Sequence, residues 1–320
     1  MATYKDIHGF KIQNVSSDPP TSVAGDLWYN STSGDLKVNL GTPSSAWSTS
    51  GALNNARQLI TGAGTQTSGL AFGGDPYSSG FTETYNGSTW TEVADLTKAR
   101  YGMGGAGATN TAALGFGGYF YPGFDGTLTE SWNGSSWTEV NNLNTGRQLL
   151  AGSGTSTAAL AFGGFVPPNT AATESWNGTN WTNVNSLNTA RNQLAGDGTS
   201  TSTLAFGGNS SPNALTESWN GSNWTEVGDL TTARRTLAGA GTSNTAALAF
   251  GGDSGVINNN TETWNGTNWT EVADLSTART GLGGHGTTTA ALAFGGEGPP
   301  LSTATEEWNV TGGVSTIDAS

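Results

Sequence analysis

Short apolar runs that end in a pair of glycines recur along most of the chain. The pairs begin at Gly73, Gly117, Gly163, Gly207, Gly251 and Gly295, which lie 44 or 46 residues apart. A run such as AALAFGG at residues 158–164 is too short for a helix and is bounded by glycine, so it predicts a buried strand. A fixed period of this size indicates stacked units, because one such unit cannot bury its own apolar face alone.

Each period contains four segments that are typical of short strands. In the copy that opens at Arg147, the glycine-rich segment LLAGSGTS precedes the apolar run, and TESW follows a stretch that differs between copies. An Asn-Gly turn at Asn177 then leads to a fourth segment that begins at Trp181. Four strands per copy, without helical periodicity or capping boxes, favour a propeller blade over an α-solenoid unit. We therefore expect an all-β fold, a β-propeller of six four-stranded blades.

The landmark residues of the period resemble the Kelch repeat. That repeat has an arginine that opens the innermost strand, an aliphatic run ending in Gly-Gly, an aromatic residue, and a tryptophan shortly after it. The resemblance covers about residues 46–310 and implies a propeller like the central domain of galactose oxidase. The arginines are Arg57, Arg100, Arg147, Arg191, Arg234 and Arg279; the aromatics are Tyr85, Trp132, Trp176, Trp219, Trp264 and Trp308; the later tryptophans are Trp90, Trp137, Trp181, Trp224 and Trp269.

The two ends of the repeat region complement each other. The sixth copy stops after its third segment, EEWNV, whereas an additional fourth-type segment, AWSTSGAL with Trp47, precedes the first arginine. We expect the segment around Trp47 to pair beside residues 304–310, which would close the ring and cover an exposed sheet edge. The propeller is assigned to residues 43–312, and residues 313–320 are assigned to a C-terminal tail.

The recurring charged and aromatic residues are interpreted as architecture. Catalytic groups converge on one reacting atom, whereas a sixfold ring spreads its members around an axis. We interpret the arginines and the recurring glutamates as ion pairs or backbone-binding groups, with pairing within or between copies left open. The tryptophans are interpreted as packing between blades rather than as a sugar platform. The glutamates are Glu83, Glu130, Glu174, Glu217, Glu262 and Glu306.

Composition narrows the classes of function. The chain has 11 Lys and Arg against 24 Asp and Glu, a net charge of −13, so it has no basic stripe for nucleic acid or an anionic membrane. It has no cysteine and only His8 and His285, which is too few ligands for a copper centre of the galactose-oxidase kind. No run is long enough for a transmembrane helix, and no secretory signal is evident. We expect no enzyme activity, no cofactor and no metal site.

The copies differ most between their second and third segments. In a four-stranded blade these stretches and the connections between blades emerge on one face, which is where repeat scaffolds carry recognition. The second copy is the richest in aromatic residues, and it is flanked by aromatics of the first and third copies. Such residues suit stacking on sugar rings or contact with another protein, and self-packing of the loop is the remaining alternative. The candidate binding residues are Tyr77, Phe81, Tyr119, Phe120, Tyr121, Phe124 and Phe165.

Residues 1–42 do not follow the repeat. The segment GDLWYNSTSGDLKVNLG predicts a β-hairpin, because two short alternating stretches flank a Ser-Thr-Ser-Gly turn. Its GDLWYN and GDLKV parts resemble a stretch of about 20 residues that recurs in tail-fibre and related virion proteins of bacteriophages. The resemblance implies an attachment segment, for which Phe10, Ile12, Trp28 and Tyr29 are the candidate contact residues. A hairpin that caps the side of the propeller is the alternative.

These features lead to three hypotheses. The first is a non-enzymatic bacteriophage virion protein, a tail fibre or appendage, made in the host cytoplasm and located in the extracellular particle. Its N-terminal segment would contact other virion proteins, and its propeller would bind a host-surface glycan or receptor. The second is a structural decoration or assembly subunit that binds only neighbouring virion proteins, and the third is a carbohydrate-active enzyme. A homo-oligomer is left open, whereas nucleic-acid partners and membrane insertion are not expected.

Overall fold

The computed structural model describes residues 12–19, 22, 24–41, 44–76, 79–120, 123, 125–209, 214–312 and 314–317. The regular structure of these residues consists of β-strands in seven four-stranded sheets. The chain forms two compact units, which are Trp47–Asn309 and the pair of end segments Met1–Ala46 and Val310–Ser320. Among the described residues, no helix is long and apolar enough to cross a membrane.

Six of the sheets are the blades of a β-propeller, which confirms the expected fold class. In blades 1 to 5 the strands are antiparallel and follow chain order. Blade 1 comprises β5 (Thr61–Thr65), β6 (Ser68–Phe72), β7 (Thr82–Tyr85) and β8 (Trp90–Glu92); blade 2 comprises β9 (Gly104–Thr109), β10 (Ala112–Phe116), β11 (Thr129–Trp132) and β12 (Trp137–Glu139); blade 3 comprises β13 (Ala151–Thr155), β14 (Ala158–Phe162), β15 (Thr173–Trp176) and β16 (Trp181–Val184).

The remaining blades follow the same plan, except that the last one takes its fourth strand from the beginning of the chain. Blade 4 comprises β17 (Ala195–Thr199), β18 (Ser202–Phe206), β19 (Thr216–Trp219) and β20 (Trp224–Glu226); blade 5 comprises β21 (Ala238–Ser243), β22 (Ala246–Phe250), β23 (Thr261–Trp264) and β24 (Trp269–Glu271); blade 6 comprises β25 (Gly283–Gly286), β26 (Ala290–Phe294), β27 (Thr305–Thr311) and β4 (Ser44–Ser50). The pairing of β4 with β27 confirms the predicted ring closure.

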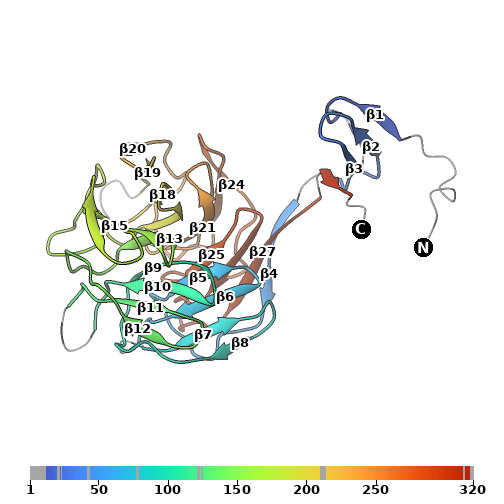
Figure 1. The fold of residues 1–320 in the computed structure, drawn as a ribbon. Coiled ribbons are helices and arrows are strands. Elements are labelled where there is room, and N and C mark those ends of the chain that lie inside the picture. The colour runs from blue at the N-terminus through green and yellow to red at the C-terminus, as the bar shows by residue number, and fades with distance from the viewer. Residues whose placement is uncertain are drawn as a thin grey trace. The chain divides into compact units, whose positions relative to one another are not determined.

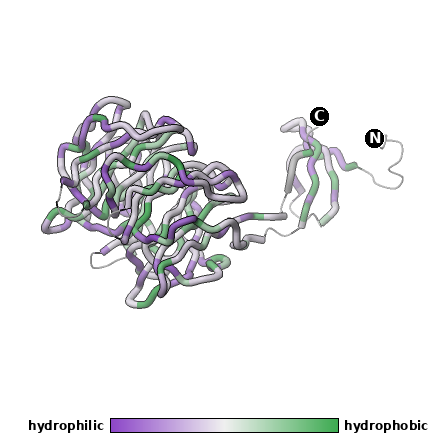
Figure 2. The backbone as a smooth tube through the Cα atoms, turned by 90° about the horizontal axis from the view of Figure 1, so that it is seen from below, coloured by the Kyte–Doolittle hydropathy of each residue, from purple (hydrophilic) through white to green (hydrophobic). Residues whose placement is uncertain are grey.

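The first strands are innermost and the second strands carry most of the core. Neighbouring first strands contact one another in the cyclic order β5, β9, β13, β17, β21, β25 and back to β5. Figure 1 shows the propeller and labels several of these strands, among them β5, β9 and β13. The last four residues of every second strand are buried, because both faces of each sheet pack against a neighbouring blade. Figure 2 shows these apolar stretches recurring around the propeller between polar segments.

Glycine in the first strand allows the blades to approach one another near the axis. A Cβ atom on Gly152 of blade 3 would lie 2.5 Å from the carbonyl oxygen of Gly105 and 2.5 Å from Phe116 Cζ in blade 2. Neither atom can withdraw without moving the neighbouring blade, so any side chain at Gly152 would force the two sheets apart. The glycine-rich first strands of the sequence are thus a requirement of the closed ring.

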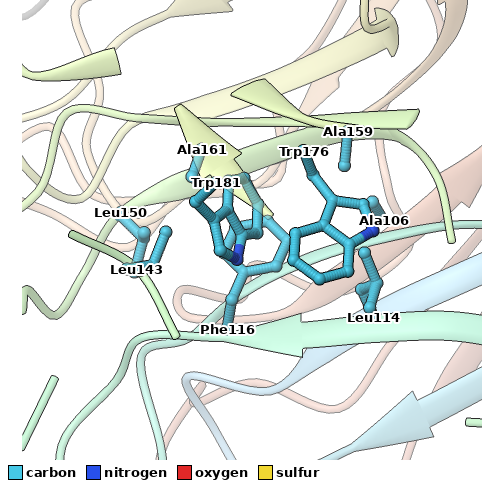
Figure 3. Close-up of a cluster of buried hydrophobic side chains, with 9 residues drawn as sticks. All are labelled: Ala106, Leu114, Phe116, Leu143, Leu150, Ala159, Ala161, Trp176 and Trp181. Carbon is cyan, nitrogen blue, oxygen red and sulfur yellow. The ribbon is translucent and has the colours of Figure 1, made fainter. Parts of the chain in front are cut away.

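Each fourth-strand tryptophan binds the preceding blade in two ways. Trp181 of blade 3 donates its indole N–H to Thr129 Oγ1 of blade 2 over 3.1 Å, and its ring centroid lies 4.9 Å from that of Phe116 (Figure 3). The equivalent hydrogen bonds and ring contacts occur at all six blade interfaces, which confirms the packing interpretation of these tryptophans. The bonded pairs are Trp47 and Thr261, Trp90 and Thr305, Trp137 and Thr82, Trp181 and Thr129, Trp224 and Thr173, and Trp269 and Thr216.

The six opening arginines pair with the third-strand glutamates of their own blades. The N–O distances run from 2.6 to 3.3 Å, and every side chain involved is at most 2% exposed. Burial lowers the pKa of Arg147, and the charge of Glu174 opposes this shift. Glu174 also accepts the backbone N–H of Asn144 at 2.7 Å, and Arg147 donates to the carbonyl of Ala161 at 3.1 Å. The pair therefore ties the connection between two blades to the blade that follows it.

The seam between blades 6 and 1 has polar contacts of its own. Tyr85 stands where the other five blades have a third-strand tryptophan, and its hydroxyl donates to Glu307 Oε1 at 2.6 Å. Ser50 of β4 also bonds Glu307 at 3.0 Å and contacts the Tyr85 hydroxyl. Gln66 donates to the carbonyl of Trp308 at 2.6 Å. These contacts join the first and last blades directly, in addition to the Trp–Thr bond found at every interface.

The second unit is a small sheet in the order β1 (Gln13–Val15), β2 (Leu27–Asn30), β3 (Asp35–Asn39) and β28 (Val314–Thr316). The antiparallel pair β2–β3 with its turn at residues 31–34 confirms the predicted hairpin. Residues 314–316, which the sequence pattern assigned to a tail, pair with β3. Three residues that follow a Gly-Gly pair in the sequence carry too little pattern to predict a strand.

Replacing Trp47 tests ring closure. Trp47→Ala removes the hydrogen bond to Thr261 and the contact with the Phe250 ring, whose centroid lies 4.9 Å away. Because Trp47 is half-buried, we expect it to lower the free energy of unfolding by about 2–3 kcal/mol, against about 3–5 kcal/mol for Trp224→Ala at a buried interface. Denaturant unfolding measures both, and an unchanged midpoint for Trp47→Ala would contradict the closure.

A double-mutant cycle tests the pairing within blades. Arg147→Met and Glu174→Gln each leave a buried partner uncompensated, so each should destabilise by about 3–5 kcal/mol. Their effects should be non-additive by about 1–3 kcal/mol because the two side chains bond each other. Arg191→Met is the matched control, since Arg191 pairs with Glu217, and additivity is expected between Arg191→Met and Glu174→Gln. Additivity in the first cycle would rule out the assigned pair.

Candidate functional site

The loops between second and third strands emerge at one end of the propeller, which we call the variable face. At this face, the residue after each opening arginine forms an isolated antiparallel bridge with the first residue after the Gly-Gly pair. Tyr101 and Tyr119, for example, exchange backbone hydrogen bonds of 3.0 and 2.9 Å. We call these six bridges the rim pairs: Gln58 and Asp75, Tyr101 and Tyr119, Gln148 and Phe165, Asn192 and Asn209, Arg235 and Asp253, and Thr280 and Glu297.

The rim pairs share a backbone geometry and differ in chemistry. The rings of Tyr101 and Tyr119 lie 5.4 Å apart at 51° to each other. Arg235 and Asp253 form an ion pair at 2.9 Å, and this bond lowers the pKa of Asp253. Burial raises the pKa of Tyr101, and the charge of Asp75 in the neighbouring blade adds to the shift. The six positions therefore display aromatic, acidic, basic, amide and hydroxyl groups in a fixed order.

The predicted binding residues fall partly within this ring. Tyr119 and Phe165 are members of rim pairs, and Phe120 follows Tyr119 as a half-buried residue bridged to Gly123. Phe81 lies outside the ring of rim pairs, is 42% exposed, and has the Arg57 guanidinium 5.9 Å from its ring centroid. Tyr77, Tyr121 and Phe124 lie outside the described residues.

The predicted attachment residues belong to the small sheet. Trp28 is 1% exposed and donates its indole N–H to Asp18 at 3.0 Å, so it holds the sheet together from inside. Tyr29, the next residue, points to the other side and is 38% exposed. Ile12 is half-buried, and Phe10 lies outside the described residues.

The sequence interpretation missed the partners of the variable loops. Tyr101, Gln58 and Arg235 each follow an opening arginine, and this position differs in every blade except for a second glutamine at position 148. The signal was a variable residue directly after an invariant one. It was overlooked because the position belongs to a short connection that the strand pattern does not cover, and its pairing with the loop depends on the fold.

A closed ring of backbone hydrogen bonds lies immediately inside the rim pairs. The residue two positions after each opening arginine has a φ of 49–62°, and its N–H donates to the same position of the preceding blade over 2.7–3.1 Å. Leu149 and Gln193 are members, and such residues enter this left-handed region only at a cost of about 1–3 kcal/mol. The cavity on the axis at this level is only about 90 Å³. The members are Leu59, Gly102, Leu149, Gln193, Thr236 and Gly281.

The channel widens at the opposite end, the turn face, where the turns after the first and third strands lie. A cavity of about 340 Å³ on the axis, the axial cup, is lined by the first strands of all six blades. Most of its wall is glycine, alanine and threonine. Each first strand carries a Gly-x-Gly segment whose middle residue varies, and these residues are Ala63, Ala106, Ser153, Asp197, Ala240 and His285.

Two of these middle residues have strongly perturbed pKa values. Burial raises the pKa of Asp197 to about 8, although its carboxylate accepts the N–H of Gly198 at 2.7 Å and that of Gly241. Asp197 is half-buried and belongs to the residues that line the cup. Burial lowers the pKa of His285 to about 4. His285 is 6% exposed, and its ring nitrogens have no hydrogen-bond partner among the described residues.

No protein-family model matches this chain, and a search of curated proteins finds no match. Among the described residues, no cluster of three or more His, Asp or Glu side chains is arranged to hold a metal ion. The two candidate regions of the propeller are therefore the rim pairs at the variable face and the axial cup at the turn face.

His285 and Asp197 should give the stability opposite pH dependences. In the unfolded chain His285 binds a proton below its ordinary pKa of 6.5, whereas in the folded protein it stays neutral down to about pH 4. The wild-type protein therefore loses stability as the pH falls from 6.5 to about 4. Folded Asp197 keeps its proton up to about pH 8, whereas the unfolded residue loses it near pH 3.8. Its contribution is therefore present below pH 3.8 and is lost as the pH rises to about 8.

Denaturant unfolding from pH 4 to 8 separates these contributions. The difference in free energy of unfolding between the variant His285→Ala with Gly69→Ala and wild type should rise by about 2 kcal/mol, in favour of the variant, as the pH falls from 7 to 5. For Asp197→Ala, the free energy of unfolding relative to wild type should instead rise steadily as the pH rises from 5 to 8. Ser153→Ala is the control, because its hydroxyl does not titrate and bonds Thr203. Difference profiles that stay flat for both variants would show that neither group is perturbed in the folded protein.

Proposed function

We propose that this chain is a non-enzymatic bacteriophage virion protein, a tail-fibre or appendage component, whose propeller binds a host-surface glycan or receptor through its variable face. The observation that carries this proposal is the ring of rim pairs. Its backbone geometry is the same in each blade, and its side chains differ in each blade. A repeated scaffold that holds non-repeated side chains in a ring is suited to recognition.

The repeated residues leave little room for function elsewhere in the blades. The arginines and glutamates are buried against each other, and the fourth-strand tryptophans are bonded to threonines of neighbouring blades. The rim pairs, in contrast, form the same backbone bridges with aromatic, charged and amide residues. Because the scaffold does not depend on which side chains occupy them, their chemistry is free to serve a partner.

The groups at the variable face fit the chemistry of a glycan. The paired rings of Tyr101 and Tyr119, together with Phe165, offer apolar surfaces on which a sugar ring can stack. Asp75, Glu297 and the amides of the other rim pairs can bond hydroxyl groups. A protein receptor would use the same mixture of aromatic anchors and polar rim.

The small unit supports the virion assignment. Its hairpin is formed by the segment that resembles the tail-fibre stretch. Register pairs Leu27 with Val38 and Tyr29 with Leu36, so these four side chains share one face, on which Tyr29 is exposed. Such a face suits contact with another virion protein. The same observation favours the second candidate, an assembly subunit that contacts only neighbouring virion proteins.

Removing the aromatic rim pair tests this function. Tyr101→Ala combined with Tyr119→Ala keeps the backbone bridge and removes both rings, so binding to host cells or to host-derived glycans on an array should weaken by about tenfold or more. The double variant should lose some free energy of unfolding, because both rings are half-buried and contact each other. It should remain folded at the temperature of the binding assay, since the Trp–Thr contacts between blades are unchanged.

The exposed Thr157→Ala at the turn face serves as the matched control and should bind as wild type does. Glycan binding that persists in the double variant would exclude the rim pair as the site. Wild-type protein that binds no host component, but whose variants fail to assemble into particles, would establish the assembly subunit instead.

A further inference from the structure

The exposed charge of the propeller is concentrated at the variable face. The hairpin turns of the turn face contain no Asp, Glu, Lys or Arg, whereas the fourth strands and the connections after them carry many acidic residues. Outside the six buried ion pairs, Lys98 and Arg235 are the only Lys or Arg residues of the propeller, and Arg235 is paired with Asp253. The exposed acids of blades 1, 4 and 5 are Glu92, Asp95, Glu226, Asp229, Glu271 and Asp274.

The fold does not require these charges. Asp95 accepts the N–H of Thr82 at 3.3 Å, and in blade 2 the uncharged Asn142 makes the equivalent bond at 3.1 Å. Blade 3 has Asn183 at the fourth-strand position where blades 1, 2, 4 and 5 have a glutamate. Because uncharged residues occupy the same positions in other blades, the acidic residues need an explanation other than folding.

The variable face is acidic on one side and aromatic on the other. Blades 5, 6 and 1 follow one another around the ring, and each has one acidic rim residue. Blades 2 and 3 have none, and their rim pairs contain the aromatic residues. The acidic rim residues are Asp253, Glu297 and Asp75, and the aromatic ones are Tyr101, Tyr119 and Phe165.

The acidic and aromatic sides meet between blades 1 and 2. Asp75 is bridged to Gln58 by backbone hydrogen bonds of 2.8 and 2.9 Å, and the backbone ring joins the residue after Gln58 to the residue after Tyr101 at 3.1 Å. The rings of Tyr101 and Tyr119 lie 5.4 Å apart, and the charge of Asp75 contributes to the raised pKa of Tyr101. No described side chain forms an ion pair with Asp75. Two aromatic rings beside an unpaired carboxylate suit the binding of an ammonium group.

We infer that the variable face selects a glycan with free amino groups, whose ammonium is held by the Asp75 carboxylate and the rings of Tyr101 and Tyr119. This inference rests on the proposed function and names the class of glycan. An acidic glycan would be repelled by the acidic side of the face. A basic protein fits less well, because Phe81 and Val256 are the only exposed large hydrophobic side chains among the described residues of this face, too few for the apolar core of a protein interface.

Oligosaccharides of glucosamine and galactosamine test the charge of the ligand. Each is presented to the full chain as the free amine and in its N-acetylated form, at pH 6, where the free amines are protonated. We expect at least one free amine to bind wild type about tenfold or more tightly than its acetylated form, because the carboxylate and the rings attract only the charged group. Raising the NaCl concentration from about 0.05 to about 0.5 M should reduce this preference, since salt screens exposed charges.

Replacing Asp75 tests the position of the ammonium. Asp75→Asn keeps the shape of the side chain and the backbone bridge, so the variant should fold and should lose most of the preference for the free amine. Glu226→Gln is the matched control, because it removes an exposed negative charge from blade 4 on the same face and should keep the preference. An equal loss of preference in both variants would overturn the inference, since the attraction would then come from the whole face.

The same measurements separate this inference from the proposed function. Wild-type protein that binds host cells or uncharged glycans with no preference for free amines would overturn the inference and leave the proposed function standing. Wild-type protein that binds neither host cells nor any glycan would overturn both. Binding of polylysine that depends on Asp75, while no amino sugar binds, would overturn the glycan assignment in favour of a basic protein.

Discussion

The structure depends on one contact made six times, in which a fourth-strand tryptophan donates to a threonine of the preceding blade and packs on its phenylalanine. The propeller closes only if the interface between the last and first blades makes the same Trp–Thr and Trp–Phe contacts as the other interfaces. Every blade must therefore carry the tryptophan, the threonine and the phenylalanine at equivalent positions. This explains why a threonine, a phenylalanine and a tryptophan recur with so little change. It also explains why Trp47, at the other end of the propeller sequence, must complete blade 6.

Three consecutive residues connect this scaffold to the variable face. Arg57 is buried in an ion pair, Gln58 displays its side chain in a rim pair, and Leu59 joins the backbone ring in a left-handed conformation. The buried ion pair of Arg57 and the backbone hydrogen bonds of Leu59 hold Gln58 in place from both sides. The hydrogen bonds of the backbone ring also offset the strain of the left-handed conformation of Leu59. The rim side chains are therefore positioned by bonds that do not involve them. Rigid placement of variable groups limits the entropy lost when a partner binds.

The sequence predicted the features that repetition explains, and the structure adds those that depend on register. Period, Gly-Gly pairs and tryptophans were enough to predict six blades and the closing role of Trp47. Whether Glu174 pairs with Arg147 or Arg191 could not be read, because both arginines lie at one repeat position. The partner of Tyr119 and the residues that line the axis could not be predicted either. A repeat in the sequence shows which positions are equivalent, but it does not show which side chains of different blades lie next to each other.

Departures from the repeat occur in matched pairs across blade interfaces. His285 faces Gly69, Ser153 bonds Thr203, and the Tyr85 hydroxyl bonds Glu307. Because protein interiors are close-packed, a larger or more polar residue on one blade requires a smaller or bonding residue on the next. A sixfold scaffold can thus acquire a unique seam and an asymmetric axis without losing its closing contacts. Asymmetry of this kind is what a symmetric ring needs in order to bind a ligand that has no sixfold symmetry of its own.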